Sequence, residues 1–364
     1  MVQDTESCGL PTCVAVMGSI NDTPLALDFR SDTVTQPPEG MWEMMRAAEL
    51  GDDGLDGDQT ARRLEEETAN LLGKDAAIYL PTATMANLLT VLATAPRGAQ
   101  VITQINSHLY SAERAGSTLA GVLYTAIGGR QGELCLDSLA DILLSVSGPS
   151  IALVCTENTH NDSGGIVLSL DYSRRLYELC AARGVPVHLD GARIFNASVA
   201  LGCSAARIAQ YADSVTVCLS KGLSAPGGAL LVGSSPLVRQ ARLLRKTVGG
   251  TQRQTGILAA AGLYAIRHMS ARLAEDHRRA CMLAQGLRGL FPSAQCDLPD
   301  SNIVLLDLAG SKLASRNVVD ALAQVGIQAR ARRESRTRFV THRHITDASV
   351  AAVLARCIDW AREF

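Results

Sequence analysis

Two stretches decide the fold: Val185-Pro-Val-His-Leu-Asp190-Gly-Ala-Arg193 and Ser214-Val-Thr-Val-Cys-Leu-Ser-Lys221-Gly222. Each begins as an apolar, strand-like run. The first run ends directly before Asp190, and the second is separated from Lys221 by Ser220 alone. In open α/β sheets, ligands bind at the carboxyl ends of the strands. The interval between the two residues fits one helix and one strand. The sequence therefore predicts a carboxylate and an amine at neighbouring positions on the ligand-binding edge of a sheet.

Taken singly, each of these residues has an ordinary explanation. An aspartate after a strand commonly caps a helix, and a lysine is commonly a solvated surface charge. The pair is more informative, because residues 220–228 form a loop of small residues that would expose the Lys221 amine. Pyridoxal 5'-phosphate (PLP) needs both groups: a lysine forms the Schiff base, and an aspartate pairs with the protonated pyridine nitrogen. We therefore expect Lys221 and Asp190 to bind PLP.

Composition excludes several classes of protein. The chain has 364 residues, a hydrophobic content of 47%, a charged content of 19% and a net charge of −2. The small negative net charge does not favour a nucleic-acid or anionic-membrane partner. The longest apolar stretch, 257–266, is too short to span a bilayer. The ten cysteines lack CxxC spacing. We expect free thiols, no metal site and a cytoplasmic location.

Strand and helix patterns alternate from about residue 58 to 233, which predicts an α/β fold with a mostly parallel sheet and helices on both faces. The strands are expected at 76–80, 101–103, 122–124, 151–155, 185–189 and 214–219. After residue 250, a long helical pattern over 252–287 leads into a small α+β region. We expect a flexible extension (1–24), a large PLP-binding domain (25–250), and a linking helix with a small C-terminal domain (251–364).

A PLP enzyme must also hold a phosphate. Thr82, Ala83 and Thr84 follow a predicted strand and open a predicted helix, where backbone N–H groups and hydroxyls favour an anion; a plain threonine N-cap is the alternative. Arg253 follows a glycine turn and heads a helical pattern. It is a second phosphate candidate, which could act in a neighbouring subunit.

Three further side chains are candidates for the ring and the substrate. His108 follows a strand and suits stacking on the cofactor ring, although a partly buried loop histidine is the alternative. Arg193 could reach the phenolic oxygen of the cofactor, or form a salt bridge to a surface acid. Arg338 opens an apolar strand within an arginine-rich segment, whose other members we expect to be mostly solvated. Its guanidinium suits bidentate binding of a substrate carboxylate.

These candidate residues and their segments, in this order along the chain, resemble those of the low-specificity L-threonine aldolases, which belong to the aspartate-aminotransferase-like (fold type I) PLP enzymes. The resemblance covers nearly the whole chain from about residue 27. It includes the segments at 28–35, 51–58, 63–66, 157–161, 188–193, 218–226, 253–258 and 338–342.

The resemblance implies a role for each candidate residue. Lys221 would form the Schiff base, Asp190 would pair with the ring nitrogen, Arg193 would contact the phenolic oxygen, and His108 would stack on the ring. The phosphate would be surrounded by Thr82, Ala83, Thr84 and Arg253, and the substrate carboxylate would be held by Ser31 and Arg338. The resemblance also implies a homo-oligomer, a tetramer or a dimer, whose sites are completed across an interface.

The implied reaction is retro-aldol cleavage of a β-hydroxy-α-amino acid to glycine and an aldehyde. His108 is the candidate base, because histidine titrates near neutral pH; Glu113 would orient it, and His160 is a weaker alternative. Two segments depart from the family pattern. Pro81-Thr82-Ala83-Thr84 replaces Pro-Ser-Gly-Thr, which requires a negative φ at Ala83, and Thr251-Gln252 replaces Gly-Met before Arg253. These departures leave the preferred substrate open.

The sequence is also compatible with other functions. A fold type I β-eliminating lyase, or a transferase that uses the glycine carbanion, would need the same lysine and aspartate. A nucleotide-dependent oxidoreductase is disfavoured, because no GxGxxG follows a strand and opens a helix. A non-catalytic homologue is disfavoured by the presence of Lys221 and Asp190.

Overall fold

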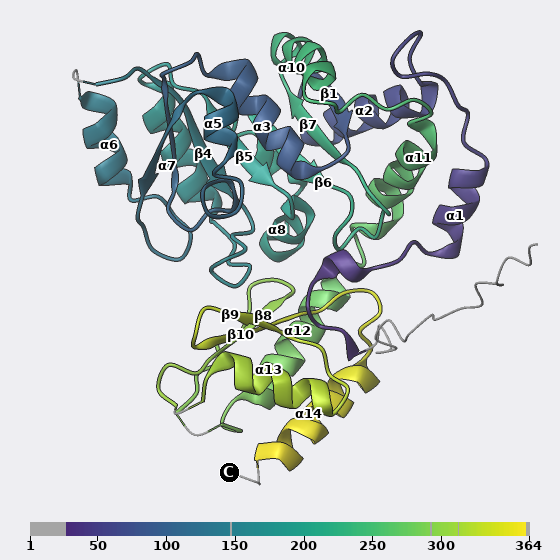
Figure 1. The fold of residues 1–364 in the computed structure, drawn as a ribbon, viewed down its shortest axis with the longest axis vertical. Helices are drawn as coiled ribbons and strands as arrows, with labels where there is room; N and C mark the ends of the chain where they lie inside the picture. The colour runs from purple at the N-terminus through teal and green to yellow at the C-terminus, as the bar shows by residue number, and fades with distance from the viewer. Residues whose placement is uncertain (1–26, 146–147, 292, 312, 362–364) are drawn as a thin grey trace, which may run out of the picture.

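The structure is a computed structural model that describes residues 27–145, 148–291, 293–311 and 313–361. The extension predicted at residues 1–24 lies outside these ranges. Figure 1 shows a larger part built around one sheet and a smaller part built around another. Among the described residues, no helix combines the length and apolar composition needed to cross a membrane.

The larger sheet has seven strands in the order β1-β7-β6-β5-β4-β2-β3. Pairs among β2 to β6 are parallel, whereas β7 runs antiparallel between β1 and β6. The prediction of a mostly parallel sheet is confirmed, but β7 is not among the predicted strands. The strands are β1 Ala76–Leu80, β2 Gln100–Gln104, β3 Leu123–Ile127, β4 Ile151–Glu157, β5 Val187–Gly191, β6 Ser214–Cys218 and β7 Ala229–Gly233.

Helices cover both faces of this sheet, as the alternating pattern predicts. One face packs against α2 Gln59–Leu72, α6 Leu136–Leu144, α7 Leu170–Ala181, α8 Ile194–Leu201, α9 Ala205–Ala209 and α11 Gly256–Tyr264. The other packs against α3 Ala83–Thr94, α4 His108–Ser111, α5 Gly116–Ala120 and α10 Ser235–Thr247. Helix α1, Glu39–Arg46, lies against α11.

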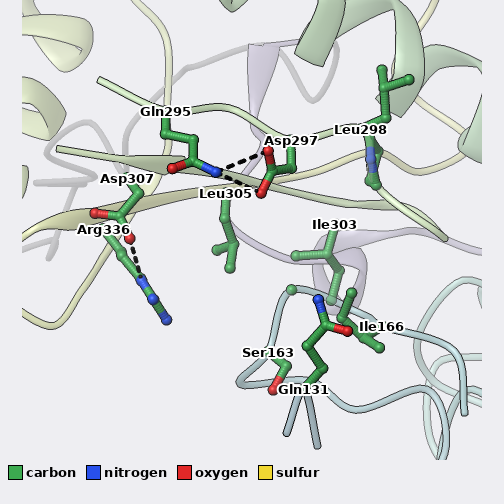
Figure 2. Close-up of a pocket in the computed structure, with 12 residues that line it drawn as sticks. Gln131, Ser163, Ile166, Gln295, Asp297, Leu298, Ile303, Leu305, Asp307 and Arg336 are labelled. Carbon is green, nitrogen blue, oxygen red and sulfur yellow. Dashed lines mark hydrogen bonds and ion pairs between the residues drawn. The ribbon is translucent and has the colours of Figure 1, made fainter. Parts of the chain in front are cut away.

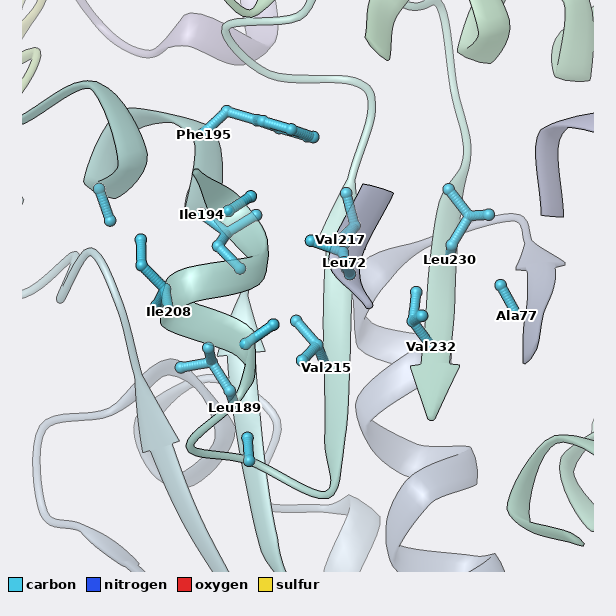
Figure 3. Packing of buried hydrophobic residues seen from close by; sticks show 14 of the residues in the cluster. Leu72, Ala77, Leu189, Ile194, Phe195, Ile208, Val215, Val217, Leu230 and Val232 are labelled. Atoms are coloured by element: carbon cyan, nitrogen blue, oxygen red, sulfur yellow. The ribbon is translucent and has the colours of Figure 1, made fainter. Parts of the chain in front are cut away.

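The core beside β5 and β6 fixes the strands that end at the candidate site. Figure 3 shows Leu189 and Val215 from these strands packing with Ile194 and Ile208 from the covering helices. Burying one such side chain contributes roughly 1.5–3 kcal/mol. The strand ends that bear the functional residues are therefore held by a rigid apolar layer.

The smaller sheet has the order β8-β10-β9 and is antiparallel throughout. Its strands are β8 Ile303–Asp307, β9 Arg330–Arg332 and β10 Arg336–Val340. The helices around it are α12 Leu273–Leu287, α13 Ser315–Gln324 and α14 Asp347–Ala361.

The first described residues pack on this smaller sheet. The Phe29 N–H donates to the Gln328 carbonyl at 2.7 Å, and the Val340 N–H donates to the Phe29 carbonyl at 2.8 Å. The Phe29 and Phe339 rings meet edge to face at 6.2 Å. A short 3-10 turn, Asp32–Val34, then leads toward the larger part. The domain boundaries given by the sequence stay a prediction.

The helical pattern expected from 252 to 287 is not one continuous helix. It consists of α11, a π-helical turn at Ala265–Met269 and α12, with residues 252–255 outside any helix. The segment that follows β2 likewise forms two short helices, α4 and α5.

Candidate active site

Neighbouring strands bring charged residues to one edge of the larger sheet. Asp190 lies near the end of β5, and in the parallel register it pairs with Glu157, the last residue of β4. Lys221 follows β6, which is the next strand. A cavity of about 420 Å³ opens at this edge. The predicted residues that line it are Ser31, His108, Asp190, Arg193, Lys221 and Arg338.

The loop between β6 and β7 holds Lys221. The Lys221 carbonyl accepts hydrogen bonds from the Ser224 N–H at 2.9 Å and from the Thr35 hydroxyl at 2.9 Å. Farther along, the Gly228 N–H donates to the Pro81 carbonyl at 3.2 Å, at a φ of 101° that suits glycine. The loop backbone is thus fixed, while the Lys221 amine makes no hydrogen bond or ion pair to any described residue.

Asp190 is held by an oriented amide. Its Oδ2 accepts a hydrogen bond from the Asn87 amide at 3.0 Å, and its Oδ1 accepts one from the Ala192 N–H at 3.1 Å. The Asn87 carbonyl oxygen in turn lies 3.1 Å from His188 Nε2, while His188 Nδ1 lies 2.8 Å from the Ser214 hydroxyl. Burial lowers the pKa of His188 to about 4, so the ring is neutral near pH 7. A neutral ring that donates from Nε2 orients the Asn87 NH2 group toward Asp190.

His108 forms a dyad with Glu113. Its Nδ1 lies 2.7 Å from Glu113 Oε1, which also accepts from the Thr84 hydroxyl at 2.9 Å. The other oxygen of Glu113 accepts from the Asn87 amide at 3.1 Å. The hydrogen bond to Glu113 raises the pKa of His108 above its ordinary value, against the opposing effect of burial. Asn87 thereby connects the His108 dyad to Asp190.

Arg193 forms a bidentate pair with Asp32. Its Nε donates to Oδ2 at 2.8 Å and its Nη2 to Oδ1 at 2.7 Å. Both side chains are almost fully buried, so the partner of Arg193 is an interior acid and not the surface acid considered from the sequence. Burial alone would raise the pKa of Asp32, but the charge and hydrogen bonds of Arg193 lower it well below its usual range.

Arg338 is buried without a carboxylate partner among the described residues. Its Nη1 donates to Asn161 Oδ1 at 3.1 Å and its Nη2 to the Arg30 carbonyl at 3.0 Å, while Nε has no partner. Burial, followed by the neighbouring charge of Arg193, lowers the pKa of Arg338 to about 9. A buried cation with only neutral acceptors favours the binding of an anion.

Other predicted residues lie outside the cavity lining. Thr82 caps α3 by accepting from the Met85 N–H at 3.1 Å. Ala83 is the first residue of α3 and does not have a positive φ, so alanine is compatible with this turn. The Arg253 side chain is 69% exposed and 3.8 Å from Asp52. His160 is buried, with Nδ1 accepting from the Ser163 N–H at 3.3 Å and Nε2 unpartnered.

Some residues of the site were given no role from the sequence. Glu157 accepts from the backbone N–H groups of His108 at 2.6 Å and Asn161 at 2.8 Å, and burial raises its pKa. Asp32 and Asn87 act as the partners described above. Glu157 comes two residues after the strand predicted at 151–155 and could have been found by the same rule as Asp190.

A separate pocket of about 390 Å³ lies between the 163–166 loop and the smaller sheet. Figure 2 shows Ile303 and Leu305 in its lining and Arg336 paired with Asp307, 2.9 Å apart. None of the predicted site residues lines it. Within the described ranges, no group of three or more His, Cys, Asp or Glu residues is arranged to hold a metal ion.

Comparison with known proteins identifies the family. Residues 28–311 match the family described as β-eliminating lyase. The chain belongs to this family. It is 40% identical over 341 residues to low-specificity L-threonine aldolase 1 of Arabidopsis thaliana, a match that covers 91% of this chain and 95% of the relative. Within the β-eliminating lyases, the chain therefore groups with the low-specificity L-threonine aldolases.

Solved structures share the fold of this β-eliminating lyase family member. Leishmania major threonine aldolase superposes with a TM-score of 0.74 at 18% identity, covering 92% of this chain and 98% of that one. SPT solved with PLP superposes with a TM-score of 0.71 at 19% identity, covering 93% and 85%. The fold is that of the fold type I PLP enzymes, as the sequence predicts.

Proposed function

We propose that this protein uses PLP to cleave a β-hydroxy-α-amino acid of the L-threonine or L-allo-threonine kind into glycine and an aldehyde. The observation that carries the proposal is one cavity lined by the Lys221 amine, the Asp190 carboxylate and the Arg338 guanidinium, which has only neutral acceptors and an unpartnered Nε among the described residues. Family membership supports it, because the relatives aligned over almost their whole length are threonine aldolases.

The residues of the cavity fit PLP. Lys221 has a free amine for the covalent bond, and Asp190 accepts two N–H hydrogen bonds that fix the orientation of its carboxylate. Arg193 and His108 line the same cavity and suit the phenolic oxygen and the face of the ring. The N-terminus of α3, with Thr82, Ala83 and Thr84, and Arg253 are proposed for the phosphate. When bound, PLP would supply the electron sink that stabilises a negative charge on Cα.

The remaining residues would orient the substrate and move its protons. Arg338 and Ser31 would bind the α-carboxylate and so fix the direction of the Cα–Cβ bond. His108 would accept the proton of the β-hydroxyl as that bond breaks, and Glu113 would hold the imidazole in place through the 2.7 Å contact. Protonation at Cα would then release glycine.

We further propose a homo-oligomer, a tetramer or a dimer, in the cytoplasm. Arg253 is exposed beside the 51–58 loop, and the Asp53 N–H of that loop donates to the Arg253 carbonyl at 3.1 Å. In or next to these segments, Leu50, Leu55 and Ile257 are exposed, with 49%, 79% and 41% of their surface accessible. An apolar surface around an exposed arginine suits an interface that delivers Arg253 to a neighbouring site. Free thiols at the eight described cysteines support a reducing compartment.

Spectra and products test the proposal together. Lys221→Ala should abolish both the visible absorption of the lysine-bound cofactor and turnover, whereas Lys246→Ala, at an exposed lysine of α10, should change neither. Asp190→Asn should retain cofactor and lose most activity. Incubation with threonine, allo-threonine or phenylserine should release glycine and aldehyde in equal amounts. A keto acid and ammonia without glycine would instead establish a β-eliminating lyase.

A further inference from the structure

The hairpin of β9 and β10 gathers arginines on one face. In its antiparallel register, Arg338 lies directly opposite Arg330, and Arg336 lies directly opposite Arg332. Opposed residues and alternate residues of a strand share a face. All four guanidinium groups therefore project from the same side of the hairpin. The sequence favoured solvated positions for most of the arginines in this segment. Arg330 is exposed and Arg332 is half-buried, and both line the cavity that contains Lys221.

The acids nearby do not balance this charge. Arg336 pairs with Asp307 at 2.9 Å, outside the Lys221 cavity. Asp162 is shared, with one oxygen 3.2 Å from Arg332 and the other 2.7 Å from Arg333. Arg330 has no carboxylate partner among the residues that the structure describes, and neither does Arg338.

The surplus positive charge is concentrated at the cavity. Like charges placed directly opposite each other on a sheet are unfavourable. Arg338 is buried and already feels the charges of Arg193, Arg332 and Arg330, which act with burial to lower its pKa. One substrate carboxylate on Arg338 would leave Arg330 uncompensated and the single acid Asp162 still shared by two arginines. The cavity rim therefore has capacity for a second negative charge.

We propose that Arg330, with Arg332 beside it, binds a second negative charge on the substrate, so that the site prefers a β-hydroxy-α-amino acid with an acidic β-substituent. The inference rests on the proposed function, in which Arg338 takes the α-carboxylate. The smallest such substrate is 3-hydroxyaspartate. Its Cα–Cβ bond breaks, the β-hydroxyl loses its proton as its carbon becomes an aldehyde, and Cα gains a proton. The products are glycine and glyoxylate, and no oxidant or reductant is needed.

Kinetics with an acidic and a neutral substrate test this preference. The holoenzyme should cleave L-threo- or L-erythro-3-hydroxyaspartate with a higher kcat/KM than threonine. Arg330→Ala should lower kcat/KM for 3-hydroxyaspartate by about 10- to 100-fold, the effect of losing a charge-assisted hydrogen bond, and for threonine by less than about 3-fold. Arg316→Ala, at an exposed arginine of α13 outside the cavity, should change neither. Arg330→Glu should reverse the preference.

A binding measurement separates this inference from the proposed reaction. By calorimetry, the holoenzyme should bind L-aspartate more tightly than L-alanine, and Arg330→Ala should remove the difference. An equal loss of both substrates in Arg330→Ala would assign Arg330 to the α-carboxylate and overturn the inference, as would no loss of either. Threonine cleavage without a preference for 3-hydroxyaspartate would overturn the inference alone. An Arg330-dependent preference for aspartate, without glycine from any β-hydroxy amino acid, would overturn the reaction but keep the second anion site.

Discussion

The amide nitrogen of Asn87 lies 3.0 Å from Oδ2 of Asp190, to which it donates a hydrogen bond. The same NH2 group donates to Glu113 at 3.1 Å. One residue of α3 therefore positions two carboxylates: Asp190, proposed to pair with the ring nitrogen, and Glu113, proposed to orient the base His108. The Asn87 side chain is fully buried and its carbonyl oxygen is already engaged by His188. The amide therefore has no alternative orientation that keeps these bonds.

Replacing Asn87 should impair the chemistry at Cα. Asn87→Ala removes a donor from two largely buried carboxylates, at a cost of about 1–3 kcal/mol. We expect holoenzyme-catalysed exchange of the glycine α-proton to fall by about 10- to 100-fold, measured by NMR in deuterated water. Asn87→Asp should be worse, because a third carboxylate would face the other two. Asn70→Ala, at an exposed position of α2, is the control. Unchanged exchange in Asn87→Ala would refute the positioning role.

Glu113→Gln should move the pH profile of cleavage. The hydrogen bond to the Glu113 carboxylate raises the pKa of His108, so the base form of His108 becomes populated at a higher pH than it would without this partner. Without that charge the pKa of His108 falls, and the acidic limb of the kcat/KM profile should shift to lower pH. Glu334→Gln, at an exposed glutamate outside the cavity, should leave the profile in place. A profile unchanged in Glu113→Gln would exclude His108 as the titrating base.

Arg338→Lys should weaken amino-acid binding even though the charge is kept. An ammonium group cannot reproduce the planar fork that a guanidinium presents to a carboxylate. We expect the Kd for glycine to rise by about 10- to 100-fold, the range for a charge-assisted contact, with little change in PLP affinity. Calorimetry measures both, and Arg316→Lys is the matched control. If Arg338→Lys binds glycine normally, another arginine of the cavity holds the α-carboxylate.

Asp32→Ala should destabilise the fold strongly. It would leave Arg193 buried without its carboxylate, and breaking a buried ion pair in this way costs about 3–5 kcal/mol. The comparison is Glu39→Ala, which removes the exposed pair with Arg46 and should cost less than about 1 kcal/mol. Thermal unfolding of both variants checks the contrast. Similar melting temperatures for the two would show that Arg193 finds another partner.

Protonation of His188 should weaken the fold as the pH falls. Because burial lowers the pKa of His188 from 6.5 to about 4, the folded state resists its protonation. The unfolded state therefore binds this proton first as the pH falls. The free energy of unfolding keeps its full value above about pH 6.5 and decreases progressively toward pH 4, by about 3 kcal/mol in total. The melting temperature of His188→Gln should therefore depend less on pH over this window than that of the unaltered protein. Parallel pH dependences would show that the imidazole is not protonated on unfolding.

Much of the site could be predicted because its residues follow strands. Asp190, Lys221 and His108 each come after a recognisable strand, and parallel strands end at one edge. Asp32, Asn87 and Asn161 escaped notice, because their partners lie far away in the chain. Asp32, for example, meets Arg193 across 161 residues. Nothing in the local sequence marks such a meeting.

Two features of the fold also could not be predicted from the local sequence. The run 229–233 is apolar and follows two glycines, which indicates a strand, but its antiparallel direction depends on how the lysine loop packs against Pro81. The interruption at 265–272 contains neither glycine nor proline, so the helical pattern continues through it. The phosphate role of Arg253 also remains a prediction, because within one chain this arginine is exposed and is not among the residues that line the cavity.

The packing of Phe29 against the smaller sheet has a consequence for biosynthesis. His342 Nε2 lies 2.7 Å from the Asp28 carbonyl, 314 residues earlier in the chain. As a ribosome makes the chain from its amino end, the larger sheet can assemble while residues 27–30 still lack their partners. The smaller core closes only when β8 and β10 have emerged, which leaves Phe29 exposed for most of translation. We expect nascent chains that stop before residue 303 to be more sensitive to protease near Phe29 than the completed protein.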